Sequence, residues 1–239
     1  MVIEISRVVR KIAKIIKYPF AEEVLVLGDS HTEAFNAFGG LDLLFSIAKY
    51  RFTVCSVGGA TASGLKNLNS KTKALRKFQN AIQRYKGKKV FIMLGEVDTG
   101  FAIWLKSQTQ NIPVEESYQK ALDNYFDFVV DLSKKFSVYV FSTPLPTISD
   151  DQSAGEIAFK RSAINISQRE RTNLTKRFNN DLESFCKKLG LQFVSLDEDS
   201  INPQTGIVRD ELINKNPLDH HYDLKTYCKL LALKISTLT

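Results

Sequence analysis

Three polar side chains that could do covalent chemistry directly follow an apolar run near the N-terminus. Residues 24–27, all valine or leucine, lead into Gly28, Asp29, Ser30 and His31. A buried parallel strand ends in this way when it passes through a tight turn into a helix. A serine at that point lies beside the unpaired N–H groups of the next helix, which favour negative charge, so Ser30 could be a nucleophile. The alternative is that Asp29 or Ser30 only caps the helix.

The three histidines of the chain all fall in segments that follow predicted strands. His31 follows the first strand, and His220 and His221 come after the fifth strand and a loop. Histidine is the side chain best suited to proton transfer near neutral pH. Asp219, two residues before His221, could orient that imidazole and stabilise its cationic form, as the third member of a hydrolytic triad does. The pattern therefore indicates a nucleophile and a base at one edge of a sheet.

Glycines and carboxylates also follow predicted strands. Gly58 and Gly59 come after the second strand, where they permit close approach of the backbone and can offer N–H donors. Glu96 and Asp98 come after the third strand, which puts two carboxylates at the same edge. We expect all four residues to lie near Ser30.

Strand-like and helix-like segments alternate along the chain. The predicted strands are residues 23–27, 52–57, 89–94, 137–142 and 191–196, and the predicted helices are residues 32–50, 70–85, 114–135, 167–189 and 223–235. Short, almost wholly apolar strands between amphipathic helices indicate a parallel sheet covered on both faces. The expected fold is a flavodoxin-like, three-layer α/β/α sandwich with a central five-stranded parallel sheet, whose functional residues lie at the carboxyl ends of the strands.

Two long connections, residues 99–113 and 144–166, follow strands at the edge where a site would lie. Connections of this length could be substrate walls or a lid. Phe101 and Trp104, the only tryptophan, belong to the first of them. Their aromatic rings could line the site or pack into the core.

The composition is that of an ordinary globular protein, with 44% hydrophobic and 25% charged residues in a chain of 239. We expect an N-terminal basic amphipathic helix in residues 1–22 and one α/β domain in residues 23–239. The net charge of +7 is dispersed over lysine-rich segments, so we expect no nucleic-acid partner. Three cysteines without a CxxC motif fit free thiols in a reducing compartment, and we expect a cytoplasmic protein.

The N-terminal segment, residues 1–17, places isoleucine and valine at helical spacing with arginine and lysine between them. Such a helix can lie on an anionic membrane surface, which would make the protein peripheral to the membrane, or it can pack on its own domain. The segment is too interrupted by charge for a signal peptide, and no apolar run in the chain is long enough to span a bilayer.

The motifs ending at Ser30 and His221 resemble those of the SGNH, or GDSL-like, hydrolase superfamily, and the likeness extends over residues 23–236. Gly-Asp-Ser at the first strand end resembles the block that supplies the nucleophilic serine. The resemblance implies that Ser30 attacks an ester carbonyl, that His221 removes its proton and that Asp219 orients His221. The superfamily's usual spacing is Asp-x-x-His, so the shorter spacing here leaves His220 as the alternative base. His221 is preferred because at least one residue separates the superfamily's aspartate from its histidine.

The resemblance assigns the oxyanion hole to the N–H groups of Ser30 and of Gly58 or Gly59. The superfamily's third block is usually Gly-x-Asn-Asp, in which the asparagine side chain donates to the oxyanion. Val97 stands at that position and cannot donate. Loss of one such donor costs roughly 3 kcal/mol in other hydrolases. His31, next to the nucleophile, could compensate.

Gly-Asp-Ser-His and Gly-Glu-x-Asp blocks resemble those of a subgroup often found beside polysaccharide and cell-surface glycan genes. This resemblance implies a serine esterase that removes O-acyl groups, such as acetyl, from a glycan or another acylated small molecule. The alternatives are an acyltransferase to a sugar and an inactive glycan-binding or assembly protein. The residues expected to bind substrate or support the site are Asp29, His31, Glu96, Asp98, Phe101, Trp104 and His220.

Metal-dependent chemistry is a further alternative, because enough nitrogen and oxygen ligands for zinc or manganese gather at the strand ends. The candidate ligands are Asp29, His31, Glu96, Asp98, Asp219, His220 and His221. Their spacing favours no particular set, and we expect the chain to use neither a metal nor a cofactor.

Overall fold

The computed structural model describes residues 21–38, 49–151 and 164–238. The amphipathic helix predicted over residues 1–22 lies outside this part of the chain except at its end, and Glu22 already belongs to the first strand. None of the helices in the described ranges is long and apolar enough to cross a bilayer.

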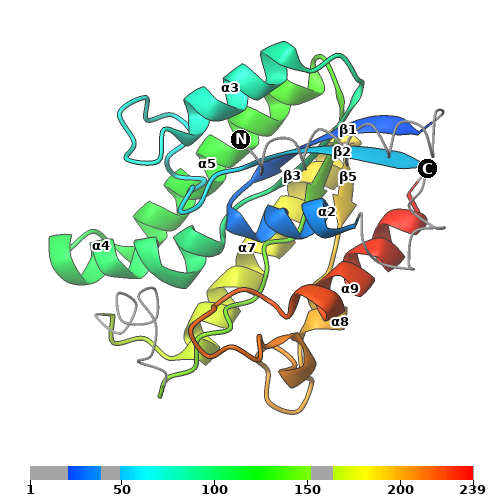
Figure 1. The fold of residues 1–239 in the computed structure, drawn as a ribbon. Coiled ribbons are helices and arrows are strands. Elements are labelled where there is room, and N and C mark those ends of the chain that lie inside the picture. The colour runs from blue at the N-terminus through cyan, green and yellow to red at the C-terminus, as the bar shows by residue number, and fades with distance from the viewer. Residues whose placement is uncertain (1–20, 39–48, 152–163, 239) are drawn as a thin grey trace, which may run out of the picture.

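As the sequence predicts, five parallel strands form one sheet (Figure 1), and their order is β2-β1-β3-β4-β5. The strands are β1 (Glu22–Gly28), β2 (Tyr50–Ser56), β3 (Lys89–Met93), β4 (Ser137–Phe141) and β5 (Gln192–Val194). β2 lies on one side of β1, and β3, β4 and β5 follow on its other side. The ends of β1, β2 and β3 are level, since Gly28 pairs with both Ser56 and Met93. Ligand sites of open α/β sheets lie at such a point, where the strand order reverses.

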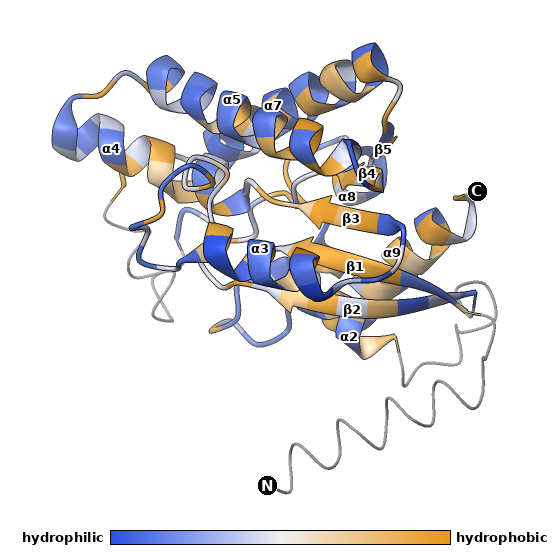
Figure 2. Ribbon diagram, turned by 90° about the horizontal axis from the view of Figure 1, so that it is seen from above, coloured by the Kyte–Doolittle hydropathy of each residue, from blue (hydrophilic) through white to orange (hydrophobic). Residues whose placement is uncertain are grey.

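The helices cover both faces of the sheet. They are α2 (Ala34–Ala37), α3 (Ala74–Arg84), α4 (Ile103–Gln110), α5 (Val114–Ser133), α7 (Gln168–Leu189), α8 (Asp197–Ser200) and α9 (Leu224–Ser236). Figure 2 shows α5 and α7 on one side of the sheet, and α2 and α9 on the other. Three shorter helical turns accompany them: η1 (Ser30–Glu33), η3 (Asp98–Ala102) and η4 (Asp210–Leu212).

Alternate residues of the strands enter two separate cores. Leu25 and Leu27 of β1 pack with residues of α3, α5 and α7, among them the fully buried Phe178. Val24 and Val26 face the opposite way and pack with α2 and α9. Both faces of the sheet are therefore apolar, which explains why the strands read as continuous hydrophobic runs.

Two predicted elements differ from the observed ones. The helix predicted over residues 32–50 is a short turn, η1, followed by α2, and residues 39–48 of that range are not among those described. The connection predicted over residues 99–113 contains two helices, η3 and α4. Their sequence has no regular apolar face, and Ile103 is the one fully buried residue of α4, so periodicity could not indicate a helix there.

Candidate active site

The turn after β1 uses Asp29 as its cap and leaves Ser30 without that role. Asp29 is fully buried, and its Oδ1 accepts a hydrogen bond from the backbone N–H of His31 at 3.0 Å. Ser30 begins η1 and is half-buried, and its Oγ forms no hydrogen bond with the described residues. The capping alternative is therefore correct for Asp29 but not for Ser30, whose hydroxyl is available at the carboxyl edge of the sheet.

Two Asp-x-His turns with the same local geometry lie in this site. Asp219 Oδ1 accepts from the backbone N–H of His221 at 3.0 Å and lies 2.6 Å from its Nδ1. Asp29 Oδ1 makes the equivalent pair of contacts with His31, at 3.0 and 3.2 Å. A carboxylate can only accept, so each Nδ1 carries the ring hydrogen. In the neutral rings, the lone pair therefore lies on Nε2, which is the tautomer that a general base needs.

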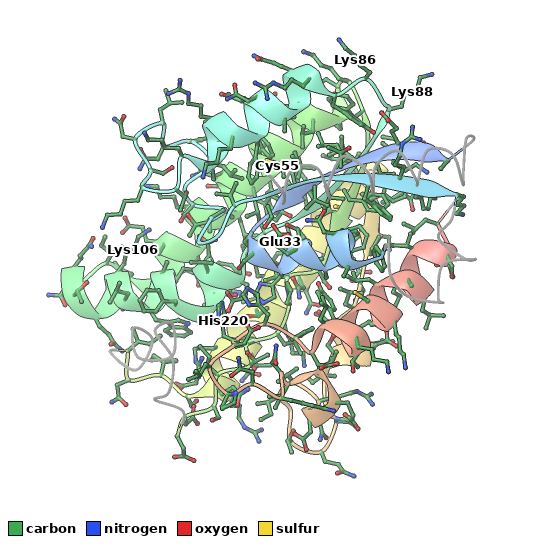
Figure 3. The ribbon with its side chains drawn as sticks, viewed as in Figure 1. Glu33, Cys55, Lys86, Lys88, Lys106 and His220 are labelled. Atoms are coloured by element: carbon green, nitrogen blue, oxygen red, sulfur yellow. The ribbon has the colours of Figure 1, made fainter. Side chains whose placement is uncertain are left out.

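The three histidine rings lie together. The ring centroids of His31 and His221 are 4.9 Å apart, and those of His220 and His221 are 4.1 Å apart. Figure 3 shows His220 beneath the N-terminal end of α2, on the side toward α4. Because His31 follows Ser30 directly, the predicted base packs against the residue next to the predicted nucleophile in the chain. The expectation that the three histidines gather at this edge of the sheet is thus confirmed.

His221 has one ring nitrogen bound and one without a hydrogen-bond partner. Its Nδ1 is held by Asp219, whose other oxygen accepts from Asn214 at 3.0 Å. Its Nε2 is shielded from solvent and forms no hydrogen bond with any described residue, Ser30 included. Although partial burial acts to raise the pKa of the Asp219 carboxyl, the bonds from His221 outweigh it and hold that pKa below its usual value. Asp219 is therefore ionised across the neutral range.

The predicted oxyanion glycines lie in a loop that Asp98 holds. Gly58 and Gly59 are exposed, and Gly59 has a φ of +72°, in the left-handed region that favours glycine. Asp98 is fully buried and accepts from the N–H groups of Ala62 and Ser63. Burial raises the pKa of the Asp98 carboxyl, although these hydrogen bonds act in the opposite direction. Asp98 thus fixes the loop from inside the protein, and its carboxylate is closed to solvent.

The other predicted site residues surround the third strand end. Glu96 is buried, and its charge adds to the burial that raises the pKa of Tyr222, the residue after His221. Phe101 lies half-buried in η3, which is a π-helix. Trp104 packs against the core, and its Nε1 donates to the carbonyl of Thr99 at 2.7 Å. Of the two aromatic residues, Trp104 therefore takes the core position.

One buried network at the same edge was missed by the sequence analysis. Asp197 follows β5 and accepts from Asn179 Nδ2 at 2.8 Å, while Asn179 also bonds both backbone groups of Thr143. These contacts join the ends of β4 and β5. The sequence does indicate Asp197, because it is the first charged residue after the fifth predicted strand, as Glu96 is after the third.

The Asp197→Asn variant is expected to be more stable than the wild type at pH 7.5. Burial raises the pKa of Asp197 to about 6, so its ionised form is disfavoured in the folded state. The folded chain then binds more protons than the unfolded one between the ordinary aspartate pKa and pH 6. The cost is fully present above pH 6 and disappears as the pH falls toward 4. Urea unfolding should show a gain of about 2 kcal/mol at pH 7.5, and little at pH 4.5.

A smaller gain at pH 7.5 than at pH 4.5 would contradict the raised pKa. Asparagine keeps the Oδ1 acceptor that Asn179 uses, so loss of that bond does not confuse the result.

The Gly28→Ala variant is expected to destabilise the fold by about 3 kcal/mol. A Cβ at this position would overlap the carbonyl oxygen of Met93 and the Cγ2 of Thr32, and β1 is central in the sheet, so it cannot move aside. Gly58→Ala is the matched control, because a Cβ there meets nothing within 4 Å. The free energy of unfolding in urea should fall for the first variant and stay near the wild-type value for the second. Equal values for both would show that the turn can relax.

Comparisons with known proteins show what shares this architecture. No protein-family model matches the sequence, and no match was found among curated proteins. The structure is similar to a GDSL-like lipase from Bacteroides thetaiotaomicron, with a TM-score of 0.57 and 13% identity over 89% of this chain and 86% of that one. It is also similar to an acetyl xylan esterase, with a TM-score of 0.57 and 14% identity over 89% and 97% of the two chains.

A third similar structure is a catalytic mutant of an acetylxylan esterase from Geobacillus stearothermophilus. Its TM-score is 0.57, with 12% identity over 91% of this chain and 95% of that one. At such low identity these likenesses establish the fold alone, which is the α/β/α sandwich that the sequence predicts.

Proposed function

We propose that the chain is a serine ester hydrolase of the SGNH superfamily, with Ser30 as nucleophile, His221 as base and Asp219 as the residue that orients the base. The observation that carries this proposal is the Asp219–His221 pair, whose imidazole packs against the residue after Ser30. The fold, which known lipases and acetylxylan esterases share, supports it. A metal is not needed for this assignment.

The proposed reaction follows from the tautomer of His221. Ser30 Oγ attacks the ester carbonyl while its proton passes to the lone pair on His221 Nε2. Asp219 then faces an imidazolium and stabilises its charge. The imidazolium returns the proton to the leaving alcohol, and water, activated by the same Nε2, releases the acid from the acyl-serine. The Ser30–His221 contact closes on substrate, as catalytic hydrogen bonds of free enzymes often do.

Backbone donors would stabilise the oxyanion. The N–H of Ser30, at the start of η1, and that of Gly58 or Gly59 are the proposed pair. Neither glycine N–H is used by another described backbone group. Val97 follows Glu96 at the sheet edge and brings no donor, so the hole has one donor fewer than the usual pattern, and we expect a correspondingly modest kcat.

The proposed substrate is a carbohydrate that carries a small O-acyl group such as acetyl. Two of the similar structures are named as acetylxylan esterases, and the Gly-Asp-Ser-His and Gly-Glu-x-Asp blocks point in the same direction. Asp219 and His221 are about one-third exposed at their side chains, which suits an acyl group presented on a bulky sugar.

A fluorophosphonate probe tests the activated serine without knowledge of the substrate. Such probes react with a serine that a neighbouring base activates. Intact mass should show one adduct on the folded protein and none after denaturation in urea. Acetate release from p-nitrophenyl acetate and from acetylated xylo-oligosaccharides then tests the substrate class, with a deacetylated sugar added as acceptor to reveal transfer. Absence of an adduct on folded protein would favour the inactive glycan-binding alternative.

A further inference from the structure

We propose that Asp219, His220 and His221 form a zinc-binding site, and that bound zinc inhibits the enzyme. The binding part stands on the side-chain cluster alone. The inhibition part rests on the proposed function, since it requires that His221 be the base. Zinc here would be a regulator that competes with the reaction and not a cofactor that performs it.

The cluster has the ligand types and the closeness that zinc requires. Each of the three residues offers one ligand atom, and these atoms all lie within 4.8 Å of one another. Two imidazoles and one carboxylate form a common donor set for zinc, which leaves its fourth position to water. The three side chains are half-buried, so an ion can enter from solvent.

His221 can take an ion in two ways, and both remove the proposed base. In the first, His220 and His221 Nε2 hold the ion, which occupies the lone pair that would accept the Ser30 proton. Asp219 is then not a ligand and still holds Nδ1, as carboxylates commonly do for metal-bound histidines. An ion between Asp219 and His221 replaces their hydrogen bond instead. In the first case the ion binds His221 Nε2, which is buried and has no hydrogen-bond partner among the described residues. In either case turnover stops until the ion leaves.

The backbone around the cluster is fixed by bonds that zinc would not disturb. The carbonyl of His220 accepts from Thr147 Oγ1, and Asp219 Oδ2 accepts from Asn214. The donors therefore need no folding of the loop before they bind an ion. This lowers the entropy cost of binding relative to a set of histidines on a loose segment.

Cobalt and zinc titrations of the full chain test the binding. After dialysis against a chelator, Co²⁺ should give a visible d–d absorption band with a 1:1 endpoint, and Zn²⁺ should displace it. His220→Gln should lower the Zn²⁺ affinity by at least about tenfold. His31→Gln, which removes the histidine outside the ligand set, should leave that affinity close to the wild-type value. No Co²⁺ band, or equal losses in both variants, would overturn the site.

Activity measurements test the inhibition separately. Zn²⁺ should lower the ester hydrolysis rate of the wild type over the same concentration range in which it displaces Co²⁺, and a chelator should restore the rate. Ser30→Ala should bind Zn²⁺ with wild-type affinity although it is inactive, so failure of the esterase assignment would not hide the site. A rise in rate on adding Zn²⁺ to the metal-free protein, or full activity with zinc bound, would overturn the inhibitory role.

Discussion

Replacing Ser30 with alanine is expected to lower kcat/KM for ester hydrolysis by about four orders of magnitude or more and to abolish the fluorophosphonate adduct. No water molecule positioned by His221 can replace the covalent intermediate at a comparable rate. The fold should be unaffected, because Ser30 Oγ bonds to no described residue. Initial rates with p-nitrophenyl acetate measure the loss, and the urea midpoint shows that the variant is folded.

A second serine at the same edge provides the matched control. Ser56 ends β2, and its Oγ donates to the backbone carbonyl of Asp29 at 3.0 Å, so its hydroxyl is already committed. Ser56→Ala should keep the adduct and an activity within about tenfold of the wild type. An adduct that survives in Ser30→Ala, or one that disappears in Ser56→Ala while the protein stays folded, would move the nucleophile elsewhere.

Replacing His221 with alanine is expected to lower kcat by about three orders of magnitude or more and to slow the labelling of Ser30 in proportion. The alanine variant lacks the imidazole that Asp219 holds in the base tautomer, so the serine proton loses its oriented acceptor and Asp219 loses its bonded partner. Stopped-flow or timed mass spectrometry of the fluorophosphonate reaction reports this step alone, without the later release of product.

His220→Ala separates the two adjacent histidines. His220 lies next to His221, but the ring nitrogen of His221 is the one held at 2.6 Å by Asp219, so His220→Ala should reduce labelling by far less than His221→Ala. If the larger loss occurred in His220→Ala, the base would be one residue earlier and the Asp-x-His turn would only be structural. Equal losses would show that the two rings act as one unit.

The positions that directly follow the strands could be predicted to gather at one edge because the sheet is parallel and the ends of β1, β2 and β3 are level. Ser30 is far in the chain from Glu96 and Asp98, yet β1 and β3, which they follow, end at the same edge. Their positions after β3 could not show that the Glu96 and Asp98 side chains take different places, since both residues follow the same strand. The backbone of η3 does so, because it turns the Asp98 carboxylate inward to the N–H groups of Ala62 and Ser63.

Contacts that depend on the exact path of a loop were beyond the sequence. The packing of His31 on His221 joins residues 190 positions apart through a loop with no regular structure of its own, and only tertiary packing sets that distance. The packing of the partly buried Trp104 against the core likewise depends on η3 and α4, whose residues carry no helical apolar period. By contrast, the predicted end of the helix at residue 189 is also the observed end of α7. Gly190 follows it with a φ of +66°, an angle that glycine adopts at little cost, so the residue type itself indicates the stop.

In the repeated Asp-x-His turn, contacts within three consecutive residues set the orientation of each histidine ring. One carboxylate oxygen holds both the backbone N–H and the ring Nδ1 of the same histidine, so the ring moves with its own peptide. A small movement of the loop that carries Asp219 and His221 would therefore leave the hydrogen on Nδ1 and the lone pair on Nε2. A protein engineer could transplant such a tripeptide into an unrelated loop and obtain a histidine of defined tautomer without rebuilding the surrounding fold.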